Sequence, residues 1–276
     1  MQLELGDRLY DLTTRSLVMG ILNRTPDSFY DRGAHWDLDR FFRLADAHVT
    51  AGADLLDVGG VKAGPGPEVT EAEELERVVP AIEALRARFD VPLSVDTWRA
   101  GVAEASFAAG AVIGNDISGF ADERYLPVAA AAGAAVVATH IRIGPRIPDP
   151  EPTYDDVVTD VNAFLAERGH RAEAAGIPRT RIALDAGLDL GKTWEQSLVL
   201  LRASDRLAAV GYPVLLSASN KTFLGKLLDL EINQRRFASH AAHALGIRLG
   251  CRILRAHDVR GARRVADVLA AIMEAS

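Results

Sequence analysis

Eight short apolar runs recur along this chain, and each of them stops at a polar residue. In chain order the polar residues are Asn23, Asp57, Asp96, Asn115, His140, Asp185, Ser217 with Ser219, and Arg255 with His257. Buried parallel strands have near-continuous apolar sequences, and the carboxyl ends of all strands in a closed β/α barrel meet at one mouth. We therefore predict an α/β fold, a TIM (β/α)8 barrel, whose strand ends build a single site.

Length and composition fit this architecture. The chain has 276 residues, 49% of them hydrophobic and 25% charged. Because α/β barrels of about 250 residues commonly form one domain, we predict a single domain over residues 1–276. No segment approaches the ~18 uncharged apolar residues of a membrane span, and no secretory signal is visible, so we expect a cytoplasmic protein without a membrane partner. A net charge of −7 argues against a nucleic-acid partner.

Helical signals fall between the apolar runs. Thr70 with Glu73 and Thr193 with Gln196 fit the capping box, in which two side chains satisfy backbone donors at a helix start. A helical apolar stripe follows each box. Further helices are expected at 37–51, 98–109, 122–132, 153–175, 234–246 and 258–274.

The first sixteen residues do not fit the βα repeat. Leu3, Leu5, Leu9 and Leu12 alternate around Gly6-Asp7, which is a two-residue turn signal. We predict a hairpin that plugs one end of the barrel. Two longer loops, 25–33 and 61–67, follow the first two strands at the predicted mouth, where lids are commonly found.

Three carboxylates and three basic residues share that mouth. They are Asp57, Asp96 and Asp185, with Lys221, Arg255 and His257. Carboxylates pair well with a flat ligand edge that carries adjacent N–H donors, such as the edge of a pterin or a guanine. Arg255 and His257 lie two positions apart and are expected to hold phosphate or pyrophosphate oxygens. The sequence therefore predicts a ligand with a donor edge and an anionic tail.

Six segments of the chain resemble the dihydropteroate synthase family. They are Met19–Phe29, Gly52–Gly60, Ser94–Thr97, Asn115–Gly119, Asp185–Gly187 with Gly191–Thr193, and Ser219–Phe223 with Arg255–Asp258. Members of that family are pterin-binding barrels that condense a dihydropterin-methyl pyrophosphate with p-aminobenzoate and release pyrophosphate. The resemblance spans nearly the whole chain.

The resemblance implies roles for individual residues. Asp96, Asn115, Asp185 and Lys221 match the family's pterin-pocket positions, and Arg255 is expected to stack near the ring. Asn23, Arg255 and His257 match its pyrophosphate site, where a magnesium ion would bridge Asn23 and the phosphates. The residues expected to act in catalysis are Asp96, Lys221, Arg255 and His257. The family also tends to form homodimers through its late helices.

Departures from the family pattern cluster on the side of the acceptor. Where the family has Glu-Ser-Thr-Arg-Pro-Gly after the second strand, this chain has residues 61–66, Val-Lys-Ala-Gly-Pro-Gly. Lys62 keeps a positive charge, although an ammonium does not reproduce a guanidinium fork. Leu190 replaces an aromatic wall, and Asp189 stands where Gly is usual and is expected to repel a benzoate. The half of the site that holds the pterin is kept, whereas the half that holds the acceptor is rewritten.

Arg24, Tyr30 and the loop Gly-Gly-Val-Lys-Ala-Gly-Pro-Gly at 59–66 resemble in particular the divergent second synthase copy of mycobacteria and related actinobacteria. We therefore predict a synthase-like transferase that binds a pterin and its pyrophosphate but handles p-aminobenzoate poorly or uses another arylamine. Two alternatives remain open. One is a non-catalytic pterin-binding protein, and the other is a methyltransferase that binds methyltetrahydrofolate and needs no pyrophosphate site.

Overall fold

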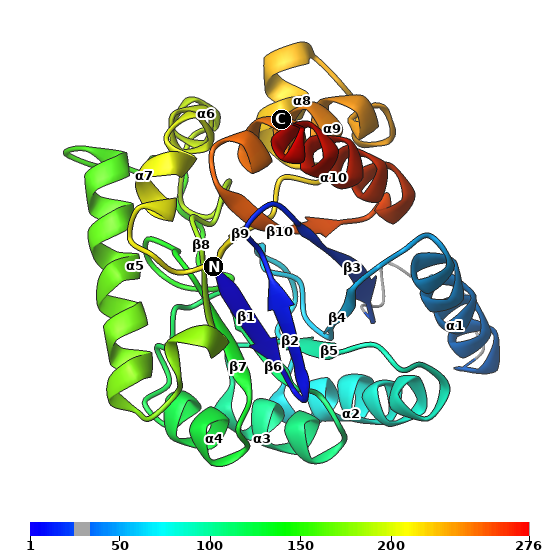
Figure 1. Ribbon diagram of the computed structural model, residues 1–276. Coiled ribbons are helices and arrows are strands. Elements are labelled where there is room, and N and C mark those ends of the chain that lie inside the picture. Colours follow the sequence, from blue (N-terminus) through cyan, green and yellow to red (C-terminus); the bar gives the residue numbers. More distant parts are fainter. Residues whose placement is uncertain (25–33, 276) are drawn as a thin grey trace.

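The computed structural model describes residues 1–24 and 34–275. Within these ranges eight parallel strands form a closed barrel with helices around its outside (Figure 1). The barrel strands are β3 (Leu17–Asn23), β4 (Leu55–Gly59), β5 (Leu93–Asp96), β6 (Ile113–Asp116), β7 (Ala135–Thr139), β8 (Ile182–Asp185), β9 (Val214–Leu216) and β10 (Cys251–Ala256). This order confirms the predicted TIM barrel. The loop at 25–33, the first of the two predicted lids, lies outside the described residues.

The helices follow the strands in alternation. They are α1 (Ala34–Thr50), α2 (Glu71–Arg88), α3 (Ala100–Ala108), α4 (Tyr125–Ala131), α5 (Val157–Ala174), α6 (Trp194–Arg202), α7 (Ser204–Ala208), α8 (Thr222–Leu228), α9 (Arg236–Arg248) and α10 (Val259–Glu274). Both predicted capping boxes are present at the starts of α2 and α6. The short helix α8 was not predicted. Across the two described ranges, no helix combines the length and apolarity needed to cross a membrane.

The amino-terminal hairpin closes one end of the barrel, as predicted. Strands β1 (Gln2–Leu5) and β2 (Arg8–Asp11) pair antiparallel and lie across the barrel opening in Figure 1. Leu3, Leu5 and Leu12 pack against the inward-facing side chains near the starts of the barrel strands. Leu9 does not join them, because the register pairs it with Glu4 on the outer face, where it is 59% exposed. The polar residues at the strand ends therefore lie at the opposite end of the barrel.

Alternation along each strand separates two apolar layers. On β3, Leu17 and Met19 face the barrel interior, whereas Val18 and Leu22 join the larger layer between the strands and the helices. Side chains at successive positions of a strand point to opposite faces, so this division is expected. Toward the carboxyl ends the interior becomes polar, and Asp57 and Asn115 lie within β4 and β6 rather than after them. The predicted site is therefore partly inside the barrel.

Candidate active site

Arg255 bridges two carboxylates at the carboxyl end of the barrel. Its Nε donates to Asp57 Oδ2 at 2.6 Å and its Nη2 donates to Asp96 Oδ2 at 2.7 Å. Asn115 Nδ2 also donates to Asp57 Oδ2, at 3.2 Å. The structure thus brings together residues from four strands, as the sequence predicts.

This cluster carries one positive and two negative charges away from bulk water. The Asp57 side chain is fully buried, and the side chains of Arg255 and Asp96 are 16% and 17% exposed. Burial raises the pKa of Asp96, although the charge of Arg255 opposes the shift. Asp57 Oδ1 has no hydrogen-bond partner among the described residues. Carboxylate oxygens in such surroundings favour a ligand that brings N–H donors.

Asp185 and Lys221 form the opposite side of the same region. The Asp185 side chain is buried, and its Oδ1 accepts from the backbone N–H of Gly187 at 2.7 Å. Burial raises the pKa of Asp185, while the charges of Lys221 and Arg255 oppose the rise. Burial likewise lowers the pKa of Lys221 against the attraction of nearby carboxylates. These opposing effects place both groups in one electrostatic cluster with Arg255.

His257 follows β10 and pairs with Ser219. Ser219 Oγ accepts from the backbone N–H of His257 at 3.1 Å and lies 3.0 Å from its Nδ1. The hydroxyl is therefore free to donate its own hydrogen to Nδ1, which leaves the ring proton on Nε2. Desolvation, together with the charge of Arg255, lowers the pKa of His257 to about 4, even though the residue reaches the surface. With its ring proton on Nε2, a neutral His257 is a hydrogen-bond donor at pH 7.

Asn23, the residue expected to hold a magnesium ion, lies beside a second oxygen donor. Asn23 is the last residue of β3, and a methyl group placed on Gly59 would lie 3.6 Å from both Asn23 Oδ1 and Asp96 Oδ2. Two hard oxygen donors therefore flank one small residue. Among the described residues no group of three or more His, Cys, Asp or Glu could hold a metal. One or two protein oxygens, as at Asn23 and Asp96, are what Mg²⁺ usually takes, since it completes its shell with phosphates and water.

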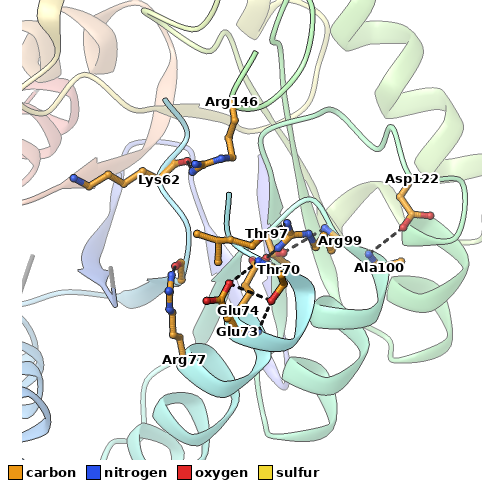
Figure 2. Close-up of polar contacts among 12 residues, drawn as sticks. Lys62, Thr70, Glu73, Glu74, Arg77, Thr97, Arg99, Ala100, Asp122 and Arg146 are labelled. Carbon is orange, nitrogen blue, oxygen red and sulfur yellow. Dashed lines mark hydrogen bonds and ion pairs between the residues drawn. The ribbon is translucent and has the colours of Figure 1, made fainter. Parts of the chain in front are cut away.

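The rewritten loop between β4 and α2 is tied to the rest of the protein by arginines. The donor–carbonyl pairs are Arg77 with Gly60 (3.0 Å), Arg146 with Lys62 (3.1 Å) and Pro67, and Arg99 with Val69 (2.6 Å). Figure 2 shows Arg146 pointing toward Lys62, and Arg99 lying against the buried carboxylate of Glu74. A surface pocket of about 430 Å³ lies beneath the loop, lined by Lys62, Arg77 and Arg146 among others. The loop is therefore held at its start, middle and end.

Lys192 and His140 form a buried pair, and this pairing was not predicted, although both residues lie in segments that the sequence marks. Lys192 Nζ lies 2.8 Å from His140 Nδ1 and donates to the carbonyl groups of His140 and Leu190 at 3.2 Å and 3.0 Å. Burial lowers the pKa of Lys192 to about 7. Burial and the charge of Lys192 lower the pKa of His140 to about 3, so the imidazole accepts the hydrogen bond. The strand-end position marked His140 and the Gly191–Thr193 segment marked Lys192, but neither signal showed that the two side chains would pair.

Asp189 contacts the start of α8 and also lines a surface pocket with Lys192 and Thr222. Its carboxylate accepts from the backbone N–H groups of Thr222 and Phe223 at the start of α8. A carboxylate that accepts hydrogen bonds from neutral amides keeps its negative charge, so the repulsion of a benzoate stays a prediction.

Comparisons with known proteins agree with this geometry. A family described as pterin binding enzyme matches residues 19–257. The chain is 43% identical to the inactive dihydropteroate synthase 2 of Mycobacterium leprae (94% of this chain, 91% of that protein) and 40% identical to the dihydropteroate synthase of Bacillus subtilis (94% and 89%). The structure of the Yersinia pestis dihydropteroate synthase with a sulfonamide drug superposes with a TM-score of 0.92 at 39% identity, and it covers 100% of both chains. The chain therefore belongs to the pterin-binding enzyme family that contains the dihydropteroate synthases, which confirms the resemblance seen in its sequence.

His243, a buried histidine outside the candidate active site, makes the stability of the fold depend on pH. His243 on α9 is 1% exposed, and neither ring nitrogen has a hydrogen-bond partner within the described chain. Burial lowers the pKa of His243 from the ordinary value of 6.5 to about 4. Between these values the unfolded chain binds a proton that the folded chain refuses, so acidification from pH 6.5 to pH 4 lowers the free energy of unfolding.

We expect His243 alone to account for a loss of up to about 3 kcal/mol over this window. Urea unfolding at pH 7 and pH 4.5 would measure it. The variant His243→Leu should lose less stability on acidification than the wild type. His170→Leu, at an exposed position, is the control and should follow the wild-type profile. Equal pH dependence in His243→Leu and wild type would contradict the prediction.

Proposed function

We propose that this protein is a dihydropteroate synthase-like transferase that binds 7,8-dihydropterin-6-ylmethyl diphosphate and transfers its pterin-methyl group to an arylamine. The observation that carries the proposal is the cluster of Asp57, Asp96 and Arg255 at the barrel mouth, facing Asp185 and Lys221. Family membership supports it, because a related structure from Xanthomonas albilineans contains 4-aminobenzoic acid and another contains 7,8-dihydropteroate.

Recognition of the pterin follows from the charges. The donor edge of the heterocycle pairs with the buried carboxylate of Asp185, since a flat edge with adjacent N–H groups forms two parallel hydrogen bonds to a carboxylate. Asn115 and Asp96 contact the ring from neighbouring strands, and Lys221 donates to its carbonyl side. Arg255 is held flat between two carboxylates, which suits stacking on the ring.

Departure of the diphosphate is the step with the largest charge change. His257 donates through Nε2–H to a phosphate oxygen, and the cationic side chains of Arg255 and Lys221 stabilise the leaving group. When bound at Asn23, a magnesium ion would neutralise diphosphate charge. Asp96 stabilises the positive charge that develops on the pterin as the methylene–oxygen bond breaks. The arylamine then attacks the methylene carbon, gaining chiefly from orientation.

A second candidate is a pterin-binding paralogue without p-aminobenzoate condensation. The rewritten loop at 61–66 and the change to Leu190 favour it, because both alter the acceptor side and leave the pterin side intact. It also agrees with the name of the 43% identical mycobacterial relative, an inactive dihydropteroate synthase 2.

One titration tests pterin binding and p-aminobenzoate condensation separately. Dihydropterin diphosphate and Mg²⁺ are added to the protein in a calorimeter, and p-aminobenzoate is then added with product detection, using the Bacillus subtilis synthase as the positive control. We expect tight first binding and at least 100-fold less dihydropteroate than in the control. Product formation at the control's rate would remove the second candidate, and absence of first binding would contradict the proposed function.

Magnesium distinguishes a transferase from a simple binder or a methyltransferase. A thermal shift caused by dihydropterin diphosphate that requires Mg²⁺ supports the transferase, because the ligand then stabilises the fold through the metal. A magnesium-independent shift by pterin alone supports a binder, and a shift by methyltetrahydrofolate supports the methyltransferase.

We also propose a cytoplasmic homodimer formed through the late helices. Phe237 on α9, with Val268 and Ile272 on α10, is 75%, 56% and 62% exposed in that order. Apolar side chains gathered on adjacent helices favour association. Light scattering coupled to size exclusion would measure the mass, and a monomer at micromolar concentration would contradict the proposal.

A further inference from the structure

The helix that follows Lys221 starts without a cap of its own. Helix α8 has seven residues, Lys221 is its N-cap, and the Lys221 side chain makes no capping hydrogen bond. The first backbone N–H groups of a helix have no partner within the helix and need acceptors from elsewhere. Ser, Thr, Asp or Asn usually supplies one at the N-cap, and lysine does not. The start of α8 therefore depends on another segment.

Asp189, in the loop between β8 and α6, supplies these acceptors. Its Oδ2 accepts from the Thr222 N–H at 2.5 Å, and both of its oxygens lie 3.2 Å from the Phe223 nitrogen. The Asp189 backbone is left-handed, with φ of 66°, and its N–H donates to Ser197 Oγ at 3.1 Å. A non-glycine residue in this conformation costs energy, so the carboxylate's bonds to α8 help to explain why Asp is tolerated there.

The other side of the same turn is held by α9 and the segment before it. Arg235 Nη1 donates to the carbonyl oxygen of Asn220 at 3.2 Å, and Ser239 Oγ accepts from the Asn220 N–H at 2.9 Å. The backbone on either side of Lys221 is therefore hydrogen-bonded to two segments, the start of α9 with the residue before it and the loop that contains Asp189. Asp189 provides the contact on the side facing Asp185, which lies four residues earlier in the same segment.

Asp189 also acts on the charge of Lys221. Burial lowers the pKa of the Lys221 ammonium, and among the neighbouring charges that oppose this shift Asp189 has the largest effect, ahead of Asp185. The same carboxylate therefore affects both the position and the protonation of one side chain in the candidate pterin pocket.

We infer that Asp189 is a positioning residue, which holds the start of α8 so that Lys221 presents its ammonium to the bound pterin. The inference rests on the proposed function, because it assigns Asp189 to the pterin side of that site.

Glycine substitutions at the two ends of α8 test the inference. Asp189→Gly removes the carboxylate at a left-handed position, and Asp229→Gly does the same at the exposed C-cap, where φ is 52°. Glycine suits both backbones, so neither change strains the fold. The dissociation constant for dihydropterin diphosphate with Mg²⁺ is measured by calorimetry, and amide exchange of residues 222–225 by mass spectrometry.

We expect Asp189→Gly to weaken ligand binding at least tenfold and to accelerate exchange at the start of α8, with both unchanged in Asp229→Gly. Asp189→Asn keeps one acceptor and should restore most of the binding at pH 7. As the pH is raised, Asp189→Asn should lose affinity for the ligand at a lower pH than the wild type does. The reason is that a neutral amide no longer favours the charged form of Lys221.

Wild-type affinity and exchange in Asp189→Gly would overturn the inference, as would an equal loss in Asp229→Gly. Failure of the wild type to bind the ligand would instead contradict the proposed function. The exchange comparison needs no ligand, so it would still decide whether Asp189 holds the start of α8.

Discussion

Replacing Arg255 with methionine is expected to lower the free energy of unfolding by about 3–5 kcal/mol and to weaken pterin binding at least 100-fold. The guanidinium is the cation that lies between Asp57 and Asp96 at 2.6 Å and 2.7 Å. Without it, two carboxylates remain away from water with no compensating charge, and removing one partner of a buried ion pair is strongly destabilising. Urea unfolding and calorimetric titration with dihydropterin diphosphate would measure the two effects.

Arg263 provides a matched control. Its side chain is also 16% exposed, and it contacts two carboxylates, Asp54 and Asp267, each at 2.8 Å. Arg263→Met should therefore reduce stability but leave the dissociation constant for the ligand within about twofold. Equal loss of binding in both variants would show that Arg255 acts only through stability.

A second substitution checks the electrostatic explanation. In the Arg255→Met background, Asp57→Asn removes one of the two uncompensated charges, and we expect it to recover stability. Recovery follows because a buried carboxylate without a cation costs more than a buried amide. Further destabilisation by Asp57→Asn would mean that lost packing of the arginine, rather than unpaired charge, explains the first result.

The barrel could be predicted because its signal is local and repeated. An apolar run that ends in a polar residue reports burial of a strand and its emergence at the mouth, and this pattern needs no knowledge of distant contacts. The capping boxes at Thr70 and Thr193 are equally local, and both helices begin where predicted. Closure of the barrel then places Asn115 beside Asp57 and Arg255 although they lie far apart in sequence.

Features that depend on contacts between segments could not be predicted in this way. Helix α8 was missed because its cap is Asp189, from a loop more than thirty residues earlier. The neutral state of His257 depends on Arg255 and the surrounding protein, and the anchoring of the 61–67 loop depends on Arg146 from the far side of the barrel. The sequence around each residue does not show which distant residues it will contact.

Replacing Asp185 with asparagine is expected to weaken binding of dihydropterin diphosphate at least 100-fold while the fold is retained. Asn has the same shape but no negative charge, and one of its two terminal groups donates where the pterin edge also donates. A hydrogen bond to a charged group contributes about 1.5–3 kcal/mol, so loss of one such bond and a clash of donors at the other reach about 3 kcal/mol, or roughly 100-fold. Calorimetry at pH 7.5 with Mg²⁺ would measure the change.

Asp116 is the matched control for this change, because it is a fully buried carboxylate on a barrel strand whose oxygens bond locally. Its Oδ1 accepts from the Ser118 N–H at 2.7 Å and its Oδ2 from the Phe120 N–H at 2.9 Å. Asp116→Asn should therefore cost stability without altering ligand affinity. If Asp185→Asn bound the ligand within threefold of wild type, the pterin edge would have to be recognised elsewhere. The carboxylates at the barrel mouth would then need another explanation, since Asp185 is the buried acceptor to which we assign that edge.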